Sequence, residues 1–362
     1  MDTKIRDICR EFKIKGEYLS YEEITIGNVN KTYKVNFRND DGTISSYVVQ
    51  EVNTYVFKSP EQVMENIANV TEFIYSKRPD ELSLHYYHTI DHKTYLLDKS
   101  GFWRLFNYIP SATYNVCDDL EIVCNAGTAF GEFQMLLSDF DASKLHETIP
   151  HFHNTRKRYE KLIESAKADP CGRVKEVEKE IEWLLSVKEK ACMMTDMRTR
   201  GELPLRVTHN DTKINNVLFD KTTKKALVVI DLDTVMPGLV GHDFGDAIRF
   251  ASNFVEEDCK DFDKAGVNLD VFTAFTKGFI KQTVHTLTEN ELNTLALGSF
   301  VLACELSTRF LDDYITGDKY FKIRYPEHNL VRTRCQIALA KDMLTKMDKM
   351  NDIVSEFAKK YR

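Results

Sequence analysis

The chain has 362 residues, of which 43% are hydrophobic, and carries a formal net charge of −7. This length can bury a sizeable core, and no Pro-, Gly- or Ser-rich stretch indicates a flexible linker, so we expect two lobes of one folded chain. Residues 1–107 hold 14 basic and 16 acidic side chains, and the rest hold 35 and 40. Neither part is a basic surface, which excludes nucleic acid and anionic membranes as expected partners.

The first residues, MDTKIRDICREFKIKG, alternate in charge where a secretory leader would need an apolar run. No later stretch reaches 18 uncharged apolar residues, so we expect a cytoplasmic protein without a membrane span. The eight cysteines show no C-x-x-C spacing. We expect them to be reduced thiols, and we infer no obligate protein partner.

Short runs rich in β-branched and aromatic residues fill the first third of the chain, with a strong turn at the sequence NDDG. These runs predict strands, and a run that opens at Pro60 with apolar residues three and four apart predicts a helix. The predicted elements are, in chain order, strands at 24–29, 31–37 and 44–52, the helix from Pro60, and strands at 84–90, 94–98 and 102–109.

After Pro110 the apolar residues repeat with the helical period of 3.6. The long predicted helices lie within residues 118–140, 173–194, 289–314 and 332–350, and one β-rich island interrupts them at 207–230. The predicted fold class is α+β, with a small sheet lobe at residues 1–107, a hinge at 106–110 and a larger helical lobe at 108–362 that carries a β-hairpin.

The β-rich island, RVTHNDTKINNVLFDKTTKKALVVIDLD, carries the clearest chemical signal. It predicts a loop, a strand at 217–219, a turn and a buried strand at 226–230 that ends at Asp231. A hairpin returns the chain to its start, so we expect Asp231 beside Asp211 and Asn216. Two carboxylates and an amide suit Mg²⁺, which fills its other positions with substrate phosphates and water. The island therefore predicts phosphoryl transfer.

His209, Asp211 and Asn216 match H-x-D-x-x-x-x-N, the kinase loop whose Asp accepts the substrate hydroxyl proton and whose Asn holds a metal. We therefore predict Asp211 as the base and Asn216 and Asp231 as Mg²⁺ ligands. Asp233 would share a face with Asp231 on an extended segment. It binds a second metal or faces solvent, and the sequence leaves both readings open.

Four segments, VTHNDTKINNVLFD, VIDLDTVMPG, DFGDAIRF and TRFLDDYITGDKYF, resemble the aminoglycoside phosphotransferase and choline kinase group, and within it the N-acetylhexosamine 1-kinases. The likeness runs over most of the chain. It implies a two-lobe, protein-kinase-like fold with a nucleotide-binding first lobe, ATP and Mg²⁺ as cofactors, and a sugar acceptor. The implied reaction is phosphorylation of the anomeric hydroxyl of N-acetylglucosamine or N-acetylgalactosamine.

Residues 243–245 spell DFG, the string that protein kinases use to hold magnesium, but they lie twelve residues beyond Asp231. The resemblance implies that Asp243 starts the next helix and braces the catalytic loop. The alternative is that Asp243 only caps that helix, with Asp246 in its first turn. We expect His209 to stabilise the loop and His153 to be structural.

The nucleotide side is less specific, because a lone Gly27 between two strands is more often a simple turn. With the catalytic loop present, the candidates for an ATP loop are Gly27, Asn28, Asn30 and Thr32. Backbone groups near Phe106 and Tyr108 would bind adenine.

The third strand departs from the protein-kinase pattern, because Gln50 takes the position of the phosphate-binding lysine of V-A-I-K. Glutamine can donate a hydrogen bond to a phosphate but brings no charge. Glu65, which would ordinarily pair with that lysine, either bonds Gln50 or is an exposed helix residue.

Arg309 lies four residues after Glu305, a spacing that by itself predicts an ordinary helical ion pair. In the N-acetylhexosamine 1-kinases the matching arginine lines the sugar pocket together with the tyrosine of GDKYF, which is Tyr320 here. The resemblance therefore makes Asp211, Arg309 and Tyr320 the substrate candidates.

Two alternatives stay open. A choline, aminoglycoside or other small-alcohol kinase has the same fold, but choline needs aromatic walls and aminoglycosides need a dense acidic pocket, and the sequence forces neither. A nucleotide-binding pseudokinase scaffold is suggested by the missing lysine. The presence of Asp211, Asn216 and Asp231 argues against it.

Overall fold

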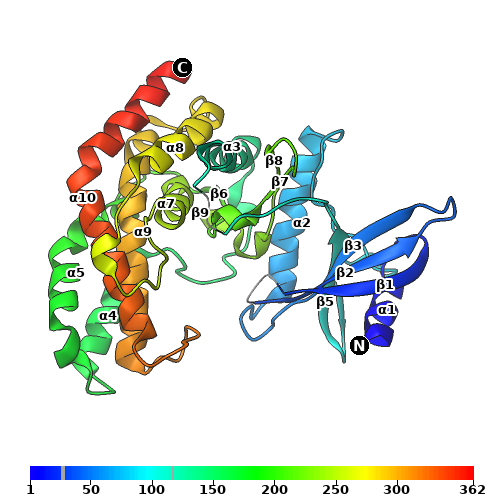
Figure 1. Cartoon of the computed structure of the whole chain (residues 1–362), viewed down its shortest axis with the longest axis horizontal. Coiled ribbons are helices and arrows are strands. Elements are labelled where there is room, and N and C mark those ends of the chain that lie inside the picture. Colours follow the sequence, from blue (N-terminus) through cyan, green and yellow to red (C-terminus); the bar gives the residue numbers. More distant parts are fainter. Residues whose placement is uncertain (26–28, 116–117) are drawn as a thin grey trace. The chain divides into compact units, whose positions relative to one another are not determined.

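Five strands of the first third form one antiparallel sheet in the computed structural model, which describes residues 1–25, 29–115 and 118–362 (Figure 1). The order across the sheet is β1-β2-β3-β5-β4. The strands are β1 (Glu17–Ile24), β2 (Lys31–Arg38), β3 (Ile44–Glu51), β4 (Leu96–Asp98) and β5 (Gly101–Asn107), accompanied by helices α1 (Asp2–Arg10) and α2 (Pro60–Lys77).

One face of this sheet is covered by α1. Tyr33, Val35 and Phe37 alternate along β2 and are buried, as the two-residue period of a strand requires. Ile5 and Ile8 of α1 belong to the same hydrophobic cluster as these three side chains. The N-terminal helix thus completes the core of the sheet.

Two expectations for this part need correction, and one helix was not predicted. The strand predicted at 24–29 lies earlier, as β1, and residues 26–28 are outside the described residues. Residues 84–90 form only isolated bridges, Tyr86 with Phe106 and Thr89 with Phe12. Their composition favours extended chain, but no neighbour offers a continuous ladder. Helix α1 was missed because its many charges hide a short apolar stripe.

The second part of the chain is helical (Figure 1). Its hairpin pairs Val217 with Val229, as predicted from the sequence. Its elements are α3 (Leu120–Leu136), α4 (Thr155–Ala168), α5 (Glu178–Ala191), α6 (Met193–Thr199), β6 (Arg206–Thr208), β7 (Val217–Phe219), β8 (Ala226–Val229), β9 (Met236–Gly238), α7 (Val240–Ala251), α8 (Leu269–Thr283), α9 (Glu289–Thr316) and α10 (His328–Tyr361).

The four long helices predicted after Pro110 are confirmed as α3, α5, α9 and α10. The segment at 173–194 is less regular than expected, because it opens with a 3₁₀ turn at Val174–Val177 and α6 follows α5 directly. The described cysteines are all free thiols, in agreement with the sequence.

Helix α9 is the central helix of this part. It begins at a capping box formed by Thr288 and Glu291 and ends at Gly317 in the left-handed conformation. By length and composition alone it could cross a membrane, but 94% of its most apolar window is buried inside the protein. It therefore has the environment of a core helix.

Glycines let α7 approach α9 closely. A Cβ atom on Gly245 would lie 2.3 Å from the carbonyl oxygen of Gly298, and one on Gly298 would lie 2.0 Å from that of Gly241. No side chain fits at such distances. The contact fixes α7, and with it Asp243, against the central helix.

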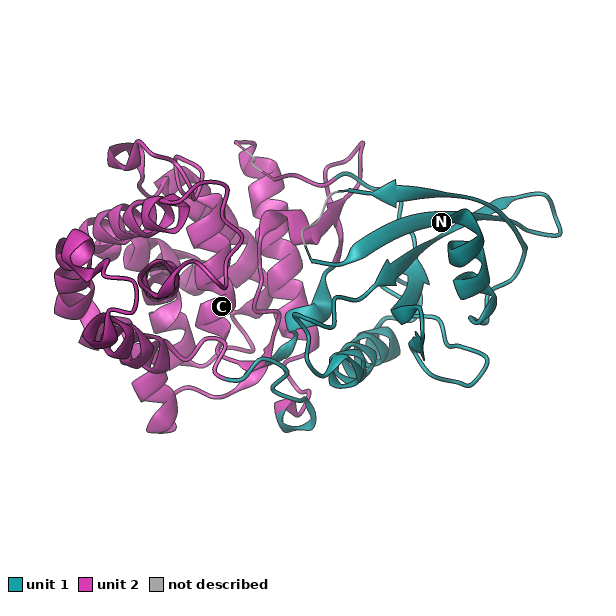
Figure 2. Cartoon of the chain, turned by 90° about the horizontal axis from the view of Figure 1, so that it is seen from below, with its two compact units in different colours: residues 1–112, 143–150, 230–236 teal, residues 113–142, 151–229, 237–362 magenta. Residues whose placement is uncertain are grey.

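By contacts, the chain divides into two units (Figure 2). Unit 1 comprises residues 1–112, 143–150 and 230–236, and unit 2 comprises residues 113–142, 151–229 and 237–362. The boundary expected at 107–108 did not include the two short segments of unit 1. The assignment of the lobes to nucleotide and sugar stays a prediction.

Candidate active site

One buried carboxylate, that of Asp243, holds the loop between β6 and β7 in place. Asp243 accepts the backbone N–H groups of His209 and Asn210, each at 2.8 Å, and the side-chain N–H of Gln134 at 2.9 Å. Burial raises the pKa of Asp243, and the two backbone donors oppose that rise. The helix is capped at Leu239 and not by Asp243, so the capping alternative is wrong. Asp243 braces the loop.

The other two residues of the DFG string have equally local roles. Phe244 is fully buried and packs its ring against those of Phe272, Phe275 and Phe279. Gly245 allows the close contact with α9. The three letters therefore have three separate structural explanations, and Asp243 is engaged with the loop.

Asp211 is presented at the tip of this loop. Asn210 has a φ of 64°, a left-handed conformation that a non-glycine residue adopts only when its surroundings impose it. The side-chain N–H of Asn216 donates to the Asp211 carbonyl at 2.8 Å and to its carboxylate at 3.1 Å. Nδ1 of His209 accepts the Asp211 backbone N–H at 3.2 Å, in agreement with the stabilising role expected for this histidine.

Lys213 is a site residue that the sequence analysis missed. Its Nζ lies 2.7 Å from the carboxylate of Asp211. Burial acts to lower the pKa of Lys213, but Asp211 and Asp246 raise it above its usual value. The residue occupies an unspecified position of H-x-D-x-x-x-x-N, so only its charge, two residues after the aspartate, could have signalled it.

Asp246 provides a second anchor for the loop. It accepts the backbone N–H of Thr212 at 3.2 Å and forms a buried ion pair with Arg249 at 2.8 Å. Burial would raise the pKa of Asp246, but Arg249 and Lys213 lower it. The carboxylate therefore stays ionised and keeps the loop in place.

A buried pair from other segments reaches the loop at Asn210. His153 Nδ1 lies 2.8 Å from Glu305, which also accepts the hydroxyl of Thr155 at 2.7 Å. His153 Nε2 lies 3.3 Å from the carbonyl oxygen of Asn210. Burial alone would lower the pKa of His153, but Glu305 raises it, whereas the pKa of Glu305 falls to about 2 despite burial, because of His153.

This pair also replaces the helical ion pair that spacing predicted between Glu305 and Arg309. The Arg309 guanidinium instead lies 5.3 Å from the ring centre of Phe152, 5.5 Å from that of Phe321 and 5.9 Å from that of Tyr320. Among the described residues it forms no ion pair. The structure thus brings Arg309 and Tyr320 together, and their contact with a sugar stays a prediction.

The nucleotide candidates of unit 1 are engaged with one another. Gly27 and Asn28 lie outside the described residues. The side-chain N–H of Gln50 donates to the hydroxyl of Thr32 at 2.9 Å, and its carbonyl oxygen accepts from Nε of Arg104 at 2.9 Å. Glu65 is exposed and lies 2.6 Å from His146, so the predicted contact between Glu65 and Gln50 is wrong.

The segment after the hairpin carries two different aspartates. Asp231 is exposed and has a φ of 62°, directly before a 3₁₀ turn at Leu232–Thr234. Asp233 is buried and forms an ion pair with Arg104, and it accepts the side-chain N–H of Asn30 at 2.7 Å. The solvent-facing reading of Asp233 is therefore wrong. Its metal role, and the meeting of Asp231 with Asp211, stay predictions.

The predicted adenine hinge continues the sheet beyond β5. The backbone N–H of Tyr108 donates to the carbonyl of Ser46 at 3.2 Å, and that of Asn107 donates to His85 at 3.2 Å. Phe106 pairs with Val48 in the same ladder. A contact with adenine through Phe106 or Tyr108 stays a prediction, and it would have to use groups other than these N–H donors.

The donor set fits a magnesium ion that is shared with a nucleotide. Over residues 1–25, 29–115 and 118–362, no three His, Cys, Asp or Glu side chains gather into a metal site. Mg²⁺ needs only one or two carboxylates when phosphates supply the remaining oxygens. Because the Asn216 amide nitrogen donates to Asp211, its amide oxygen is left for a cation. Asp211 and Asn216 are thus suitable oxygen donors, and the share of Asp231 in the same site stays a prediction.

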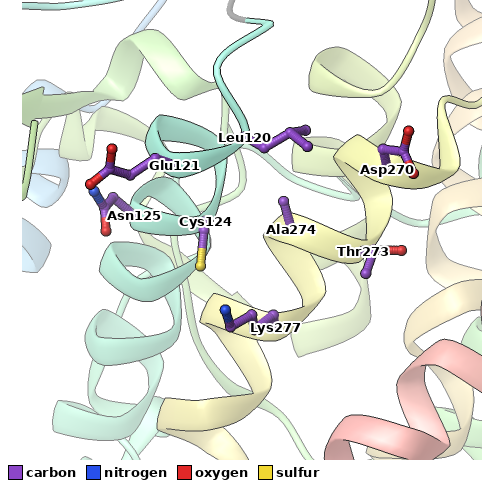
Figure 3. A pocket seen from close by; sticks show the side chains of 8 residues that line it. All are labelled: Leu120, Glu121, Cys124, Asn125, Asp270, Thr273, Ala274 and Lys277. Carbon is purple, nitrogen blue, oxygen red and sulfur yellow. The ribbon is translucent and has the colours of Figure 1, made fainter.

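A separate surface pocket of about 440 Å³ lies between the N-terminal halves of α3 and α8 (Figure 3). None of the predicted site residues lines it. Its lining residues are Leu120, Glu121, Cys124, Asn125, Asp270, Thr273, Ala274 and Lys277.

Comparisons with known proteins identify the family and the fold. A profile of the phosphotransferase enzyme family matches residues 20–273, which is more than half of the chain. An aminoglycoside phosphotransferase from Alicyclobacillus acidocaldarius is similar in structure, with 10% identity, a TM-score of 0.63, and coverage of 97% of this chain and 96% of that chain.

Two further solved structures are similar. A choline kinase from Cryptosporidium parvum has 13% identity and a TM-score of 0.55, with 99% of each chain covered. An amicoumacin kinase bound to AMP-PNP, Ca²⁺ and its antibiotic has 13% identity and a TM-score of 0.57, with 93% of this chain and 92% of that chain covered. At such identities the likeness establishes the protein-kinase-like fold alone.

Proposed function

Because the chain belongs to the phosphotransferase enzyme family, we propose that it transfers the γ-phosphoryl group of ATP to the anomeric hydroxyl of N-acetylglucosamine or N-acetylgalactosamine. The family and the similar structures support a small-molecule kinase with a protein-kinase-like fold. The proposed location is the cytoplasm, where ATP is abundant.

In the proposed reaction Asp211 orients the sugar hydroxyl and accepts its proton as the oxygen attacks the γ-phosphorus. The bond between that phosphorus and the oxygen bridging to the β-phosphate breaks, and ADP leaves. Magnesium, held by Asn216 and Asp231, would neutralise charge on the phosphate oxygens. The ammonium of Lys213, paired with Asp211 before substrates bind, supplies positive charge beside the transferred group.

The preference for a neutral sugar is supported by the surroundings of Arg309. Its guanidinium is held by three aromatic rings and has no ion-pair partner among the described residues. One of these rings belongs to Phe152, and the next residue, His153, contacts the loop beside Asp211. A cation without an ion-pair contact near the proposed acceptor site would repel choline and aminoglycosides, whereas its N–H groups can bind hydroxyl and acetamido oxygens.

An acceptor screen tests this proposal. ADP release would be measured with N-acetylglucosamine, N-acetylgalactosamine, glucose, choline and an aminoglycoside, with ³¹P NMR to locate the phosphate. We expect turnover with the N-acetylhexosamines and a phosphate on the anomeric oxygen. Turnover of choline or an aminoglycoside alone would assign the small-alcohol alternative, and ATP binding without turnover of any acceptor would assign the scaffold.

A further inference from the structure

The amide of Gln50 cannot supply the positive charge that a lysine supplies at this position. In protein kinases that lysine pairs with the α- and β-phosphates and is itself held by a glutamate. Here one N–H group of the Gln50 amide donates to Thr32 and its carbonyl oxygen accepts from Arg104, and the amide carries no positive charge. Unit 1 therefore needs its phosphate-binding cation elsewhere, provided that the proposed use of ATP is correct.

Arg104 is the residue directly opposite Gln50, on the neighbouring strand β5. Its side chain is 2% exposed, and among the described residues of unit 1 it is the only buried basic side chain. Nη1 pairs with Asp233 and Nε donates to Gln50, while the guanidinium lies 5.9 Å from the ring centre of Tyr86. Nη2 takes part in none of these bonds, so two of the five N–H donors remain.

A buried ion pair is weak support for stability, because removing two charges from water costs about as much as their attraction returns. An apolar pair would serve a purely structural purpose as well. The position of Asp233 in the sequence indicates a further role for the pair. Asp233 follows the predicted metal ligand Asp231 by two residues and is also held by Asn30. The pair thus ties the sheet to the segment that carries Asp231.

We propose that Arg104 is the cation of the nucleotide site, with Asp233 as the positioning residue that holds it. In this arrangement Nη2 contacts a phosphate of ATP, and the lysine–glutamate pair of protein kinases is replaced by an arginine–aspartate pair from β5 and the segment at 230–236. This rests on the proposed function, because it deepens the ATP site of the same reaction. It also gives Asp233 a role in which it need not bind metal.

The decisive experiment compares MgATP binding by calorimetry, the KM values for ATP and sugar, and thermal unfolding. Arg104→Gln leaves the buried Asp233 carboxylate without a counter-ion, so the double variant Arg104→Gln with Asp233→Asn, which removes both charges, guards against a loss of folding. We expect both variants to bind MgATP roughly tenfold or more weakly, as loss of a charged hydrogen bond implies, with the sugar KM little changed.

A variant with a lysine on the neighbouring strand β3 tests whether Arg104 acts through its charge or only through its packing. Gln50→Lys in the Arg104→Gln background restores a cation at the neighbouring position of the sheet, and we expect it to recover much of the MgATP affinity. Arg38→Gln is the matched control. It removes a cation from β2 of the same sheet, paired with Glu17 at 3.7 Å, and should leave ATP binding unchanged.

Wild-type affinity in the folded double variant, or no rescue by Gln50→Lys in a folded protein, would overturn the role of Arg104 and leave the kinase assignment intact. Absence of MgATP binding by the wild-type protein would overturn the proposed function, and the role of Arg104 with it.

Discussion

Asp211, Lys213 and Asn216 lie in one short loop, whereas Thr32, Gln50, Arg104 and Asp233 come from four separate segments. Both groups are linked by hydrogen bonds and ion pairs within their own unit. The loop follows a contiguous motif, so its chemistry can be read from the sequence. The sheet network exists only after strand pairing. A pattern of residues that are close together in the sequence can be recognised without a structure. A network whose residues come from separate strands cannot.

The proposed role of the loop can be tested by replacing one carboxylate oxygen of Asp211. Asp211→Asn removes the proton acceptor but keeps the shape of the side chain, so we expect kcat to fall by about 10²- to 10⁴-fold with MgATP affinity nearly unchanged. Steady-state kinetics and calorimetry measure the two effects. Asp352→Asn, an exposed change on α10, is the control. Near-normal turnover of Asp211→Asn would remove Asp211 from the role of base.

The acceptor side is probed by Arg309→Leu, which removes the cation and retains an apolar side chain between the rings. We expect the KM for the N-acetylhexosamine to rise about 10- to 100-fold, the loss of one or two hydrogen bonds to a charged group, with the KM for ATP unchanged. Arg332→Leu, which removes the cation over Phe310, is the control. An unchanged sugar KM would place the acceptor elsewhere.

The support beneath the loop can be weakened without touching the chemistry. Gly245→Ala would place a methyl group 2.3 Å from the carbonyl of Gly298, so α7 and α9 must move apart. We expect the unfolding free energy to fall by about 1–3 kcal/mol, the usual cost of overpacking a core. Denaturant unfolding measures it. A variant as stable as wild type would show that the helix contact can relax.

The smallest expected effect is a dependence on pH. His153 faces Glu305, and Asp246 favours its charge, whereas burial and Arg309 oppose it. His242 packs against His153, but burial lowers the pKa of His242 to about 3, so it stays neutral. Because the pKa of His153 is raised, its stabilisation is complete below the usual histidine pKa and is lost as pH rises through the raised value. Unfolding free energy and kcat should therefore decline towards alkaline pH.

Glu305→Gln tests the source of this decline, because it removes the charge that raises the pKa of His153. We expect its alkaline loss of stability to shift to lower pH than in the wild-type protein. His285→Gln, an exposed change after α8, should leave the profile as it is. Identical profiles for Glu305→Gln and wild type would assign the pH dependence to another group.

Much of the fold could be predicted because its signals are local. Helix α2, the long helices and the β7–β8 hairpin follow from apolar periodicity and turn residues. The first strand was predicted too late in the sequence. The polar and aromatic residues of β1 do not alternate clearly enough to locate its ends. The site loop was predicted except for Lys213, which the motif leaves unspecified.

The nucleotide side could not be predicted in the same way. The sequence could not decide whether Asp233 binds a metal or faces solvent. Its partner, Arg104, lies 129 positions away in strand β5, and no residue near Asp233 in the sequence indicates it. A signal did exist: Arg104 is a lone charge in the otherwise apolar run GFWRLF, and a charge inside a buried strand requires a counter-ion. The sequence could have raised that question, but only the strand register answers it.

The contact between α7 and α9 has a consequence for how variants of this protein would be interpreted. Residues 243–245 tolerate little change, because the first holds two backbone amides, the second fills an aromatic core and the third has no space for a side chain. A saturation mutagenesis map would therefore show an intolerant triplet spelling the magnesium motif of another enzyme family. Its intolerance would report helix spacing and loop support, so the map alone would not show where a metal binds.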